Sequence, residues 1–357
     1  MEKICIIFGG NSPEHDISII TGMQCANYLQ TKYEIEKIYI GLDNKFYYAT
    51  PVTDLGYFAD KQNIKLKPVM FFNGLSKKGI VWQKVCDIKC VVNCCHGGVG
   101  ENGNLAGFFE SLSIPFTSAP TISSAIAMDK QLTKTLVKGI IKTAKGVGVN
   151  KENFKQSSIK IEKDFGSHFI VKPNALGSSI GVKVCTKDDY KAQIEAIFEM
   201  NDSALVEEKI EPMIELNQAC YKKGEELILS AIEQPLSREE FLTFDEKYVH
   251  EGKTKVKDRL IPAPIDKKLS NKITSTTTEI YKHLGMNGVV RIDYMFNTET
   301  KELYFNEINT VPGSLAFYLF EPIGIDYITL LEDMIENCTH TKKYSYFDTK
   351  ILTKKLL

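Results

Sequence analysis

The sequence lacks a charge imbalance, a long apolar run and a regular cysteine frame. Its 44 Lys and Arg residues nearly balance 45 Asp and Glu residues, so the net charge is −1. This balance gives no electrostatic reason to expect nucleic acid or an anionic membrane as a partner. No apolar stretch approaches the roughly 18 residues that cross a bilayer. The short apolar run after Met-Glu-Lys is typical of a first strand and not of a signal peptide.

The nine cysteines are an odd number without regular spacing, in a chain too long to need disulfides. Reduced thiols in a cytoplasm account for them most simply. A zinc module could be argued from Cys86, Cys90, Cys94, Cys95 and His96, but zinc sites more often use CxxC pairs. Small apolar core residues are therefore the favoured interpretation.

The composition is that of an ordinary globular protein, 43% hydrophobic and 25% charged. The length of 357 residues predicts two or three domains. Strand patterns at 4–10, 37–42 and 88–98 alternate with helical patterns at 17–29 and 105–112. This alternation predicts an open α/β domain up to about residue 120.

Further α/β units follow. Helical spacing returns over 122–141, the polar stretch 145–158 is interpreted as a connection, and a second unit spans 168–210. Residues 235–263 are charged and without a period, which in a compact protein is usually a functional lid or a disordered segment. The stretches 289–296 and 303–308 read as strands, and the polar TETK between them predicts a hairpin turn.

The predicted hairpin carries a dense set of polar side chains. Residues two apart share a strand face, so Arg291 and Asp293 share one, and Glu307 and Asn309 share one. Burying such a set unpaired would cost several kcal/mol. Oxygen ligands of this kind suit Mg²⁺, which keeps substrate phosphates and waters in its remaining positions. A structural salt bridge between Arg291 and an acid is the alternative.

Two glycine-rich loops are candidates for phosphate binding. Gly98–Gly103 matches GxGxxG, but the acid that a dinucleotide site needs about 20 residues further on is absent. The loop 172–181 lies between two strands and lacks the GK[ST] ending of a P-loop. A hairpin of small residues can still close over phosphates, although a plain β-turn remains the alternative.

Taken together, these motifs resemble the D-alanine–D-alanine ligases of the ATP-grasp superfamily, over residues 3 to about 335. The segments that carry the resemblance, in the family's order, are FGGNSPEHDIS (8–18), HGGVGENGNLAG (96–107), IPFTS (114–118), MDK (128–130), VKPNALGSSIGV (171–182), VEEK (206–209), DEKY (245–248), RID (291–293) and NEINTVPG (306–313). The resemblance implies an α/β, ATP-grasp fold of three α/β domains with ATP between the central and C-terminal ones. The implied divisions are an N-terminal domain 1–120 that binds the first substrate, a central domain 121–210, a C-terminal domain 211–340 with the lid loop 235–263, and a tail 341–357.

The implied reaction joins two D-alanines for peptidoglycan synthesis, in the cytoplasm, with ATP and two Mg²⁺ (or Mn²⁺) ions as cofactors. The first D-alanine's carboxylate attacks the γ-phosphate, and the second D-alanine's amine attacks the resulting acyl phosphate. Negative charge develops in each step, so positioned cations and donors dominate the catalysis. The implied partners are small molecules and a second copy of the chain, bound through the N-terminal domain; nucleic acid and membrane are not expected.

The resemblance also assigns roles position by position. The residues expected to bind ATP are Lys130, Lys172, Ser179, Glu208, Lys209, Glu215 and Lys247. The expected metal ligands are Asp293, Glu307 and Asn309. At the reacting groups, Glu14 is expected to hold the first ammonium, with His96 nearby. Ser178 and Tyr248 are expected to bond to Glu14 and so close the lid. Arg291 and the Gly313 amide are expected at the oxyanion.

The sequence departs from the family's pattern at the second substrate. Tyr318 and Leu319 stand where well-known relatives have Ser-Leu, whose serine contacts the second substrate's carboxylate. Asn102 replaces the usual aspartate, a milder change. Tyr248 matches the relatives that use an amine, so a peptide product is expected. D-alanine is the expected second substrate, with D-serine or another small amino acid as the alternative.

Overall fold

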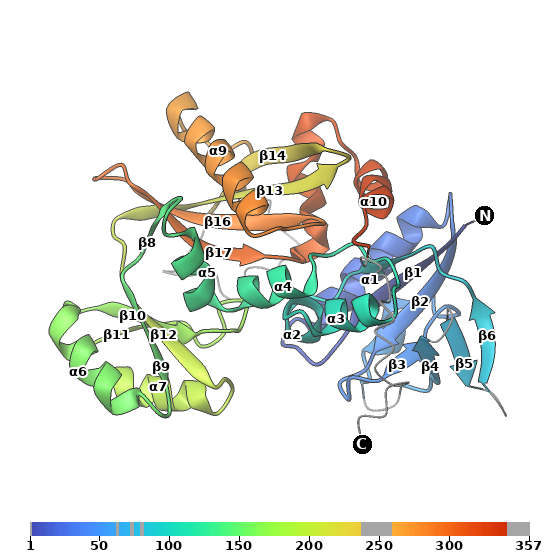
Figure 1. Ribbon diagram of the computed structural model, residues 1–357, viewed down its shortest axis with the longest axis horizontal. Coiled ribbons are helices and arrows are strands. Elements are labelled where there is room, and N and C mark those ends of the chain that lie inside the picture. The colour runs from blue at the N-terminus through green and yellow to red at the C-terminus, as the bar shows by residue number, and fades with distance from the viewer. Residues whose placement is uncertain (1, 62–63, 72–74, 79–81, 237–258, 341–357) are drawn as a thin grey trace, which may run out of the picture.

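The computed structural model describes residues 2–61, 64–71, 75–78, 82–236 and 259–340, and it arranges their strands in three sheets (Figure 1). The first sheet has the order β6-β5-β4-β3-β2-β1-β7. Its strands are β1 (Lys3–Gly9), β2 (Glu34–Ile40), β3 (Phe46–Tyr48), β4 (Lys67–Phe71), β5 (Leu75–Lys78), β6 (Trp82–Cys86) and β7 (Cys90–Asn93). Strands β2, β1 and β7 are parallel, as expected for an α/β unit.

Helices connect and cover this sheet. They are α1 (His15–Leu29), the short helix η1 (Leu55–Phe58), α2 (Gly98–Glu101) and α3 (Asn104–Ser111). Helix α1 packs against β1, where Gly22 lets the backbone approach Phe8 so closely that a Cβ atom would lie 2.5 Å from the Phe8 Cβ.

The second sheet is antiparallel, in the order β11-β10-β12-β9. It consists of β9 (Gly146–Asn150), β10 (Phe169–Pro173), β11 (Lys183–Cys185) and β12 (Ser203–Glu208), with α6 (Phe154–Asp164) and α7 (Tyr190–Phe198) packed on it. The prediction of a connection over 145–158 was therefore wrong. The glycines of this segment concealed the strand pattern of β9 in the sequence. In β9, Gly148 leaves space that the Gln131 side chain fills.

The third sheet has the order β15-β14-β13-β16-β17-β8. Its strands are β8 (Lys142–Thr143), β13 (Met213–Lys223), β14 (Glu226–Pro235), β15 (Arg259–Leu260), β16 (Val290–Asn297) and β17 (Leu303–Asn309). Helix α9 (Lys267–His283) packs on one face through apolar residues such as Ile273 and Ile280. Strands β16 and β17 are antiparallel neighbours, which confirms the predicted hairpin.

Two short helices link the sheets where a single helical stretch, 122–141, was predicted. Helix α4 (Thr121–Met128) ends at Asp129, whose backbone is extended and whose carboxylate accepts the Leu132 N–H, so that α5 (Lys130–Val137) begins anew. In Figure 1 the two helices run between the first sheet and the third, and α5 contacts both β9 and β17.

The C-terminal segment returns to the first sheet. It contains η2 (Gly313–Leu319), η3 (Glu321–Ile323) and α10 (Tyr327–Glu336). Leu319, Leu330 and other apolar residues of this segment share one buried core with Met23 and Leu29 of α1. Within the described residues no single helix has the length and apolar character to cross a membrane; one bent pair, η2–η3 with α10, passes by length and composition alone.

The close approach of Gly22 to Phe8 gives a stability prediction. Alanine normally stabilises a helix interior relative to glycine, but at position 22 its methyl group overlaps Phe8. We expect Gly22→Ala to lower the free energy of unfolding by about 1–3 kcal/mol in urea titrations. Gly139→Ala, with nothing within 4 Å of the added Cβ, is the control and should change it by less than about 0.5 kcal/mol. Equal stability of the two variants would contradict the packing described.

Candidate active site

Four polar side chains stand in one row across the third sheet. Glu233, Asn217, Asp293 and Glu307 are successive partners on β14, β13, β16 and β17. Directly opposed residues of antiparallel strands point to the same face, so the row lies on the face away from α9. Asn217 Nδ2 donates to Glu233 Oε1 at 3.2 Å. The row therefore extends the predicted pair of carboxylates by two further buried groups.

The predicted convergence at the hairpin is present in the structure. Arg291 lies opposite Asn309, two pairs along from Asp293 and Glu307 and therefore on the same face. Its Nε and Nη2 each donate to Asp293 at 2.7 Å, and Asn309 Nδ2 donates to Asp293 Oδ2 at 3.0 Å. Burial acts to lower the pKa of Arg291, but the Asp293 carboxylate outweighs it and holds that pKa well above its ordinary value. The salt bridge and the cluster of oxygen donors thus occur together.

The donor set fits a hard, oxygen-seeking cation. Asp293 and Glu307 supply carboxylates and Asn309 an amide, a set that leaves positions for phosphate and water, as Mg²⁺ prefers. Nowhere in the described part of the chain do three or more His, Cys, Asp and Glu residues gather into a metal site. Cys90, Cys94 and Cys95 are fully buried, in keeping with the core interpretation of these cysteines.

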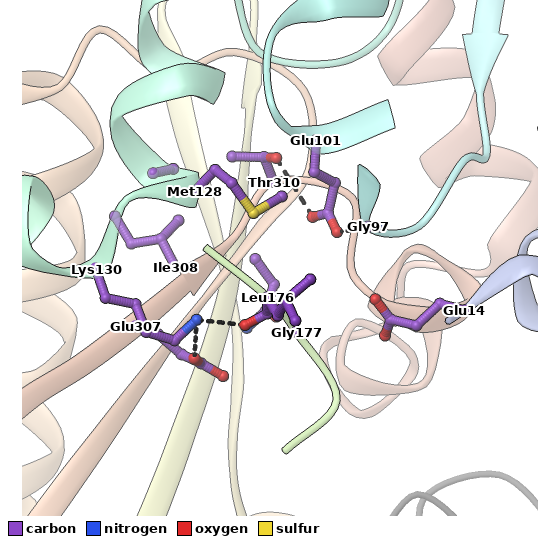
Figure 2. Close-up of a pocket in the computed structure, with 12 residues that line it drawn as sticks. Glu14, Gly97, Glu101, Met128, Lys130, Leu176, Gly177, Glu307, Ile308 and Thr310 are labelled. Carbon is purple, nitrogen blue, oxygen red and sulfur yellow. Dashed lines mark hydrogen bonds and ion pairs between the residues drawn. The ribbon is translucent and has the colours of Figure 1, made fainter. Parts of the chain in front are cut away.

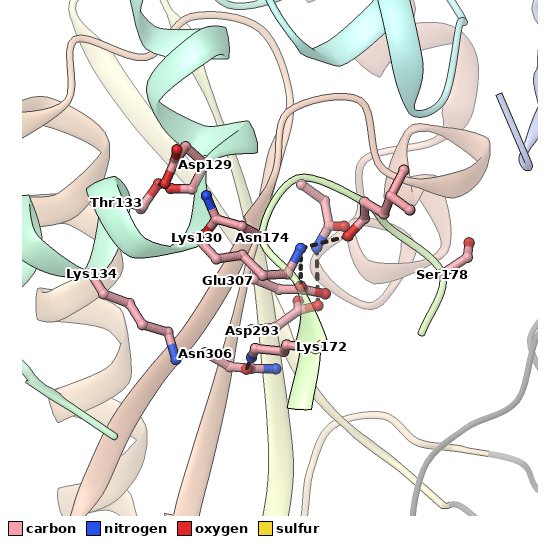
Figure 3. Close-up of polar contacts among 12 residues, drawn as sticks. Asp129, Lys130, Thr133, Lys134, Lys172, Asn174, Ser178, Asp293, Asn306 and Glu307 are labelled. Atoms are coloured by element: carbon pink, nitrogen blue, oxygen red, sulfur yellow. Dashed lines mark hydrogen bonds and ion pairs between the residues drawn. The ribbon is translucent and has the colours of Figure 1, made fainter. Parts of the chain in front are cut away.

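Lysines from the second sheet and from α5 face this set (Figure 3). Lys130 Nζ lies 3.4 Å from Glu307 Oε2 and donates to the Leu176 carbonyl at 2.6 Å. Lys172 Nζ lies 2.6 Å from Glu207 Oε2 and 3.5 Å from Asn306 Oδ1. Asn306 stands at a break in the β16–β17 register, where a bulged residue can re-aim its side chain. Of the two lysines predicted to hold phosphates, Lys130 therefore contacts the predicted metal ligand Glu307, and Lys172 contacts the residue before it, Asn306.

Sequence reasoning missed the buried pair of Glu207 and Lys134. Lys134 Nζ bonds to Glu207 Oε1, and both side chains are buried. Burial alone would raise the pKa of Glu207, but Lys134 and Lys172 lower it; burial lowers the pKa of Lys134 to about 8. The predicted Glu208 instead accepts the Lys145 N–H at 2.7 Å. Glu207 could have been found only from the register of β12 against β10, which places it two residues from the partner of Lys172.

The other predicted ATP residues that the structure describes have differing contacts. Glu215 is two residues before Asn217 on β13, so it shares the face of the polar row. Lys209 pairs with Glu211 at 2.6 Å. Ser179 has a left-handed φ of 56° in the loop after β10. Lys247 and Tyr248 lie outside the described residues.

The loop after β10 meets the first sheet at Glu14. Ser178 Oγ donates to Glu14 Oε1 at 2.5 Å, which brings this predicted pair together. A Cβ atom at Gly97 or Gly177 would approach Glu14 Oε2 to 2.9 or 3.1 Å, so both glycines leave space for the carboxylate. Figure 2 shows Glu14 and Glu307 on opposite sides of one pocket, with Gly177 between them.

His96 and Glu101 hold the loop that follows β17. The His96 ring bonds through Nδ1 to the Val311 carbonyl at 2.6 Å and through Nε2 to Thr21 Oγ1 at 2.7 Å. Burial lowers the pKa of His96, so a neutral ring donates from Nδ1 and accepts at Nε2. Glu101, which sequence reasoning did not assign, accepts the Gly97 N–H at 2.7 Å and the Val311 N–H at 2.8 Å. Both ring nitrogens of His96 are thus engaged within the protein.

Tyr318 closes the far end of the polar row. Its hydroxyl donates to Glu233 Oε1 at 3.2 Å, and the Arg259 guanidinium lies 4.5 Å from its ring centroid. Burial and the Glu233 carboxylate raise the pKa of Tyr318 to about 12. Leu319 is fully buried in the core shared with α1. Of the two predicted second-substrate residues, Tyr318 lies among the charged groups and Leu319 packs in the core.

Comparison with known proteins agrees with this architecture. Family models described as the D-ala D-ala ligase N-terminus and C-terminus match residues 3–119 and 138–336. A D-alanine–D-alanine ligase of Helicobacter acinonychis is 32% identical over 358 residues, covering 99% of this chain and 98% of the relative. The VanG D-Ala:D-Ser ligase of Enterococcus faecalis has a TM-score of 0.81 at 28% identity, covering 94% of this chain and 98% of its own. The D-alanine–D-alanine ligase of Helicobacter pylori has a TM-score of 0.77 at 29% identity, covering 96% and 100%.

The fold and the site together define an ATP-grasp ligase, a mixed α/β enzyme that uses ATP. With both family models matched along most of its length, the chain belongs to the D-alanine–D-alanine ligase family. This membership excludes the dinucleotide interpretation of the Gly98–Gly103 loop, whose glycines instead allow a close approach to the carbonyl oxygens of Asn11, Cys95 and Thr121.

The environment of Glu101 predicts how stability depends on pH. Burial and the charge of Glu14 raise the pKa of Glu101 from 4.5 to about 7. Between these values the unfolded chain loses this proton while the folded chain keeps it, so this contribution to stability falls as the pH rises towards 7. Glu101→Gln has no carboxyl group to titrate and should lack this fall in the free energy of unfolding. Between pH 5 and 7 the wild-type protein should therefore lose on the order of 1–3 kcal/mol more than the variant. Urea unfolding at several pH values measures it, and parallel curves for the two proteins would contradict the assignment.

Proposed function

We propose that this chain joins two D-alanines to D-alanyl-D-alanine where its three sheets meet, converting ATP to ADP and phosphate. The observation that carries the proposal is the approach of Lys130 and Lys172 to two neighbouring residues of β17, Glu307 and Asn306, together with the pocket that Lys130 and Glu307 share with Glu14. Cations, oxygen donors and a separate buried carboxylate are what phosphorylation of a bound amino acid requires. The family membership supports the same reaction.

Glu14 is the proposed ligand of the first D-alanine's ammonium group. It is 9% exposed, and its pocket is shared with Lys130 and Glu307. The hydrogen bond from Ser178 fixes the orientation of this carboxylate. An ammonium held at Glu14 turns the substrate's carboxylate towards the lysines, where its oxygen attacks the γ-phosphorus and ADP leaves.

Lys130 and Lys172 are the proposed phosphate ligands. Each is less than a tenth exposed and is already placed by a carboxylate, Glu307 or Glu207. Such placement means that little reorganisation is needed when ATP binds, which is the basis of electrostatic preorganisation. Asp293, Glu307 and Asn309 would hold two Mg²⁺ ions, which when bound neutralise charge on the phosphates.

Arg291 and the Gly313 amide are the proposed oxyanion ligands. The second D-alanine's neutral amine attacks the acyl carbon, and the carbonyl oxygen becomes an oxyanion. The nitrogen then loses one proton, the carbonyl re-forms, and the carbon–oxygen bond to phosphate breaks, so that phosphate leaves. Arg291 donates two hydrogen bonds to Asp293 from one edge of its guanidinium, which has five N–H donors in all. Its high pKa keeps it cationic throughout.

Two further parts of the proposal rest on the family resemblance. The second substrate is D-alanine, with D-serine as the alternative because Tyr318 replaces the usual serine and a D-Ala:D-Ser ligase is among the similar structures. Two copies of the chain associate through residues 1–120, which analytical ultracentrifugation would test.

The direct test is release of phosphate from MgATP in the presence of D-alanine, with the product identified by mass spectrometry. We expect release to depend on D-alanine and to accompany the dipeptide one for one. A set of D- and L-amino acids as second substrate then separates D-alanine from D-serine. No stimulation by any D-amino acid would overturn the proposal.

Removing the Glu307 charge should abolish turnover. Glu307→Gln keeps the shape but weakens both the metal site and the contact with Lys130, so we expect phosphate release to fall by orders of magnitude. Glu302→Gln, at a largely exposed ion pair with Lys142 just before β17, is the matched control and should stay near wild type. Near-normal activity of Glu307→Gln would refute its role.

The tyrosine at the end of the polar row gives a separate prediction. Tyr318→Ser removes the ring beneath Arg259 and the hydroxyl bonded to Glu233. We expect the KM for the second amino acid to change more than the KM for ATP, as steady-state kinetics with each substrate varied would show. If neither KM changes, Tyr318 does not border the second-substrate site.

A further inference from the structure

A left-handed turn follows directly after Gly313. Ser314, Leu315 and Ala316 have φ values of 48°, 53° and 52°. In this conformation the Cβ atom of a non-glycine residue crowds the following carbonyl oxygen, and three such residues in succession are rare. Backbone strain of this kind persists only where the surroundings impose it. The groups that impose it here come from the N-terminal part of the chain.

Thr21 and His96 hold one side of the turn. Thr21 Oγ1 accepts the Ser314 N–H at 3.3 Å and donates to His96 Nε2 at 2.7 Å. His96 Nδ1 in turn donates to the Val311 carbonyl at 2.6 Å. The chain of bonds requires the neutral tautomer of His96, and it joins the backbone on both sides of Gly313 through one helix, α1.

Glu101 holds the other side. Its Oε1 accepts the Val311 N–H at 2.8 Å and the Thr310 hydroxyl at 3.3 Å. Its Oε2 accepts the Gly97 N–H at 2.7 Å, which ties it to the residue after His96. The N–H and the carbonyl of Val311 are thus both bonded to side chains of one loop. Val311 is 3% exposed, so water could not readily replace these bonds.

We propose that Thr21, His96 and Glu101 are positioning residues for the second half of the reaction. They hold the backbone from Thr310 to Ala316 in the left-handed turn, which places the Gly313 amide and, through η2, the Tyr318 side chain. The inference rests on the proposed function, which assigns the oxyanion to Gly313. The three residues act through the turn and need not touch the substrate.

The consequence differs from a loss of ATP binding. The proposed phosphate ligands, Lys130 and Lys172, lie on α5 and β10 and are placed by other partners. Relaxing the turn therefore leaves phosphorylation of the first D-alanine in place while the attack by the second amine loses its oxyanion donor. Uncaptured acyl phosphate is then hydrolysed by water to D-alanine and phosphate, and the ratio of ADP to dipeptide rises above one.

The test compares Thr21→Val with Thr21→Ser. Valine matches threonine in shape but removes the hydroxyl, whereas serine retains it. Thr277→Val is the control, since Thr277 is equally buried and its hydroxyl contacts Tyr294 instead. ADP, dipeptide and the KM for ATP are measured for each full-length protein. Glu101→Gln joins the same comparison in case Thr21→Val does not fold.

For Thr21→Val we expect dipeptide formation to fall by roughly 10-fold to 100-fold. The ADP-to-dipeptide ratio should rise several-fold, and the KM for ATP should stay within twofold of wild type. Thr21→Ser and Thr277→Val should keep a ratio near one. An unchanged ratio in Thr21→Val and Glu101→Gln, or a parallel rise in the KM for ATP, would overturn the inference. A wild-type protein that makes no dipeptide would instead overturn the proposed function.

Discussion

The pairing of Asp293 with Glu307 across β16 and β17 is the constraint on which the site depends. Side chains alternate along a strand, so a slip of either strand by one residue would turn its carboxylate towards α9 and the apolar core. The same register places Arg291 opposite Asn309, and the next strand adds Asn217 to the row. The third sheet thus serves both packing and the site: its face towards α9 is apolar, and its other face carries the charged side chains.

The buried charges of the site have partners of opposite charge. Lys172 pairs with Glu207 within the second sheet, whereas Lys130 of α5 approaches Glu307 of the third sheet. Buried charges without partners are strongly destabilising, so the contact of Lys130 also fixes how α5 meets the third sheet. The C-terminal segment, packed on α1, completes the arrangement at the loop after Gly313. The candidate active site therefore lies at the junction of the sheets, and the same contacts support both.

Sequence reasoning reached the parts of the site that local patterns encode. The hairpin follows from alternation and a polar turn, and the Glu14–Ser178 contact from family resemblance. It missed Glu207 because two adjacent carboxylates differ only in strand face, which depends on pairing with β10. It did not predict the contact of Glu101 with Val311 or that of Glu233 with Tyr318, because these partners are distant in sequence and no motif spacing indicates them.

The central claim is that the carboxylate of one D-alanine attacks ATP at this junction and that the resulting acyl phosphate is captured by a second D-alanine. The most direct measurement uses D-alanine with ¹⁸O in both carboxylate oxygens, together with MgATP. One labelled oxygen becomes the bridge to phosphorus, and it leaves with phosphate when the amine attacks. The account predicts one ¹⁸O atom in each phosphate released alongside dipeptide, as mass spectrometry would show. Dipeptide formed with unlabelled phosphate would contradict it.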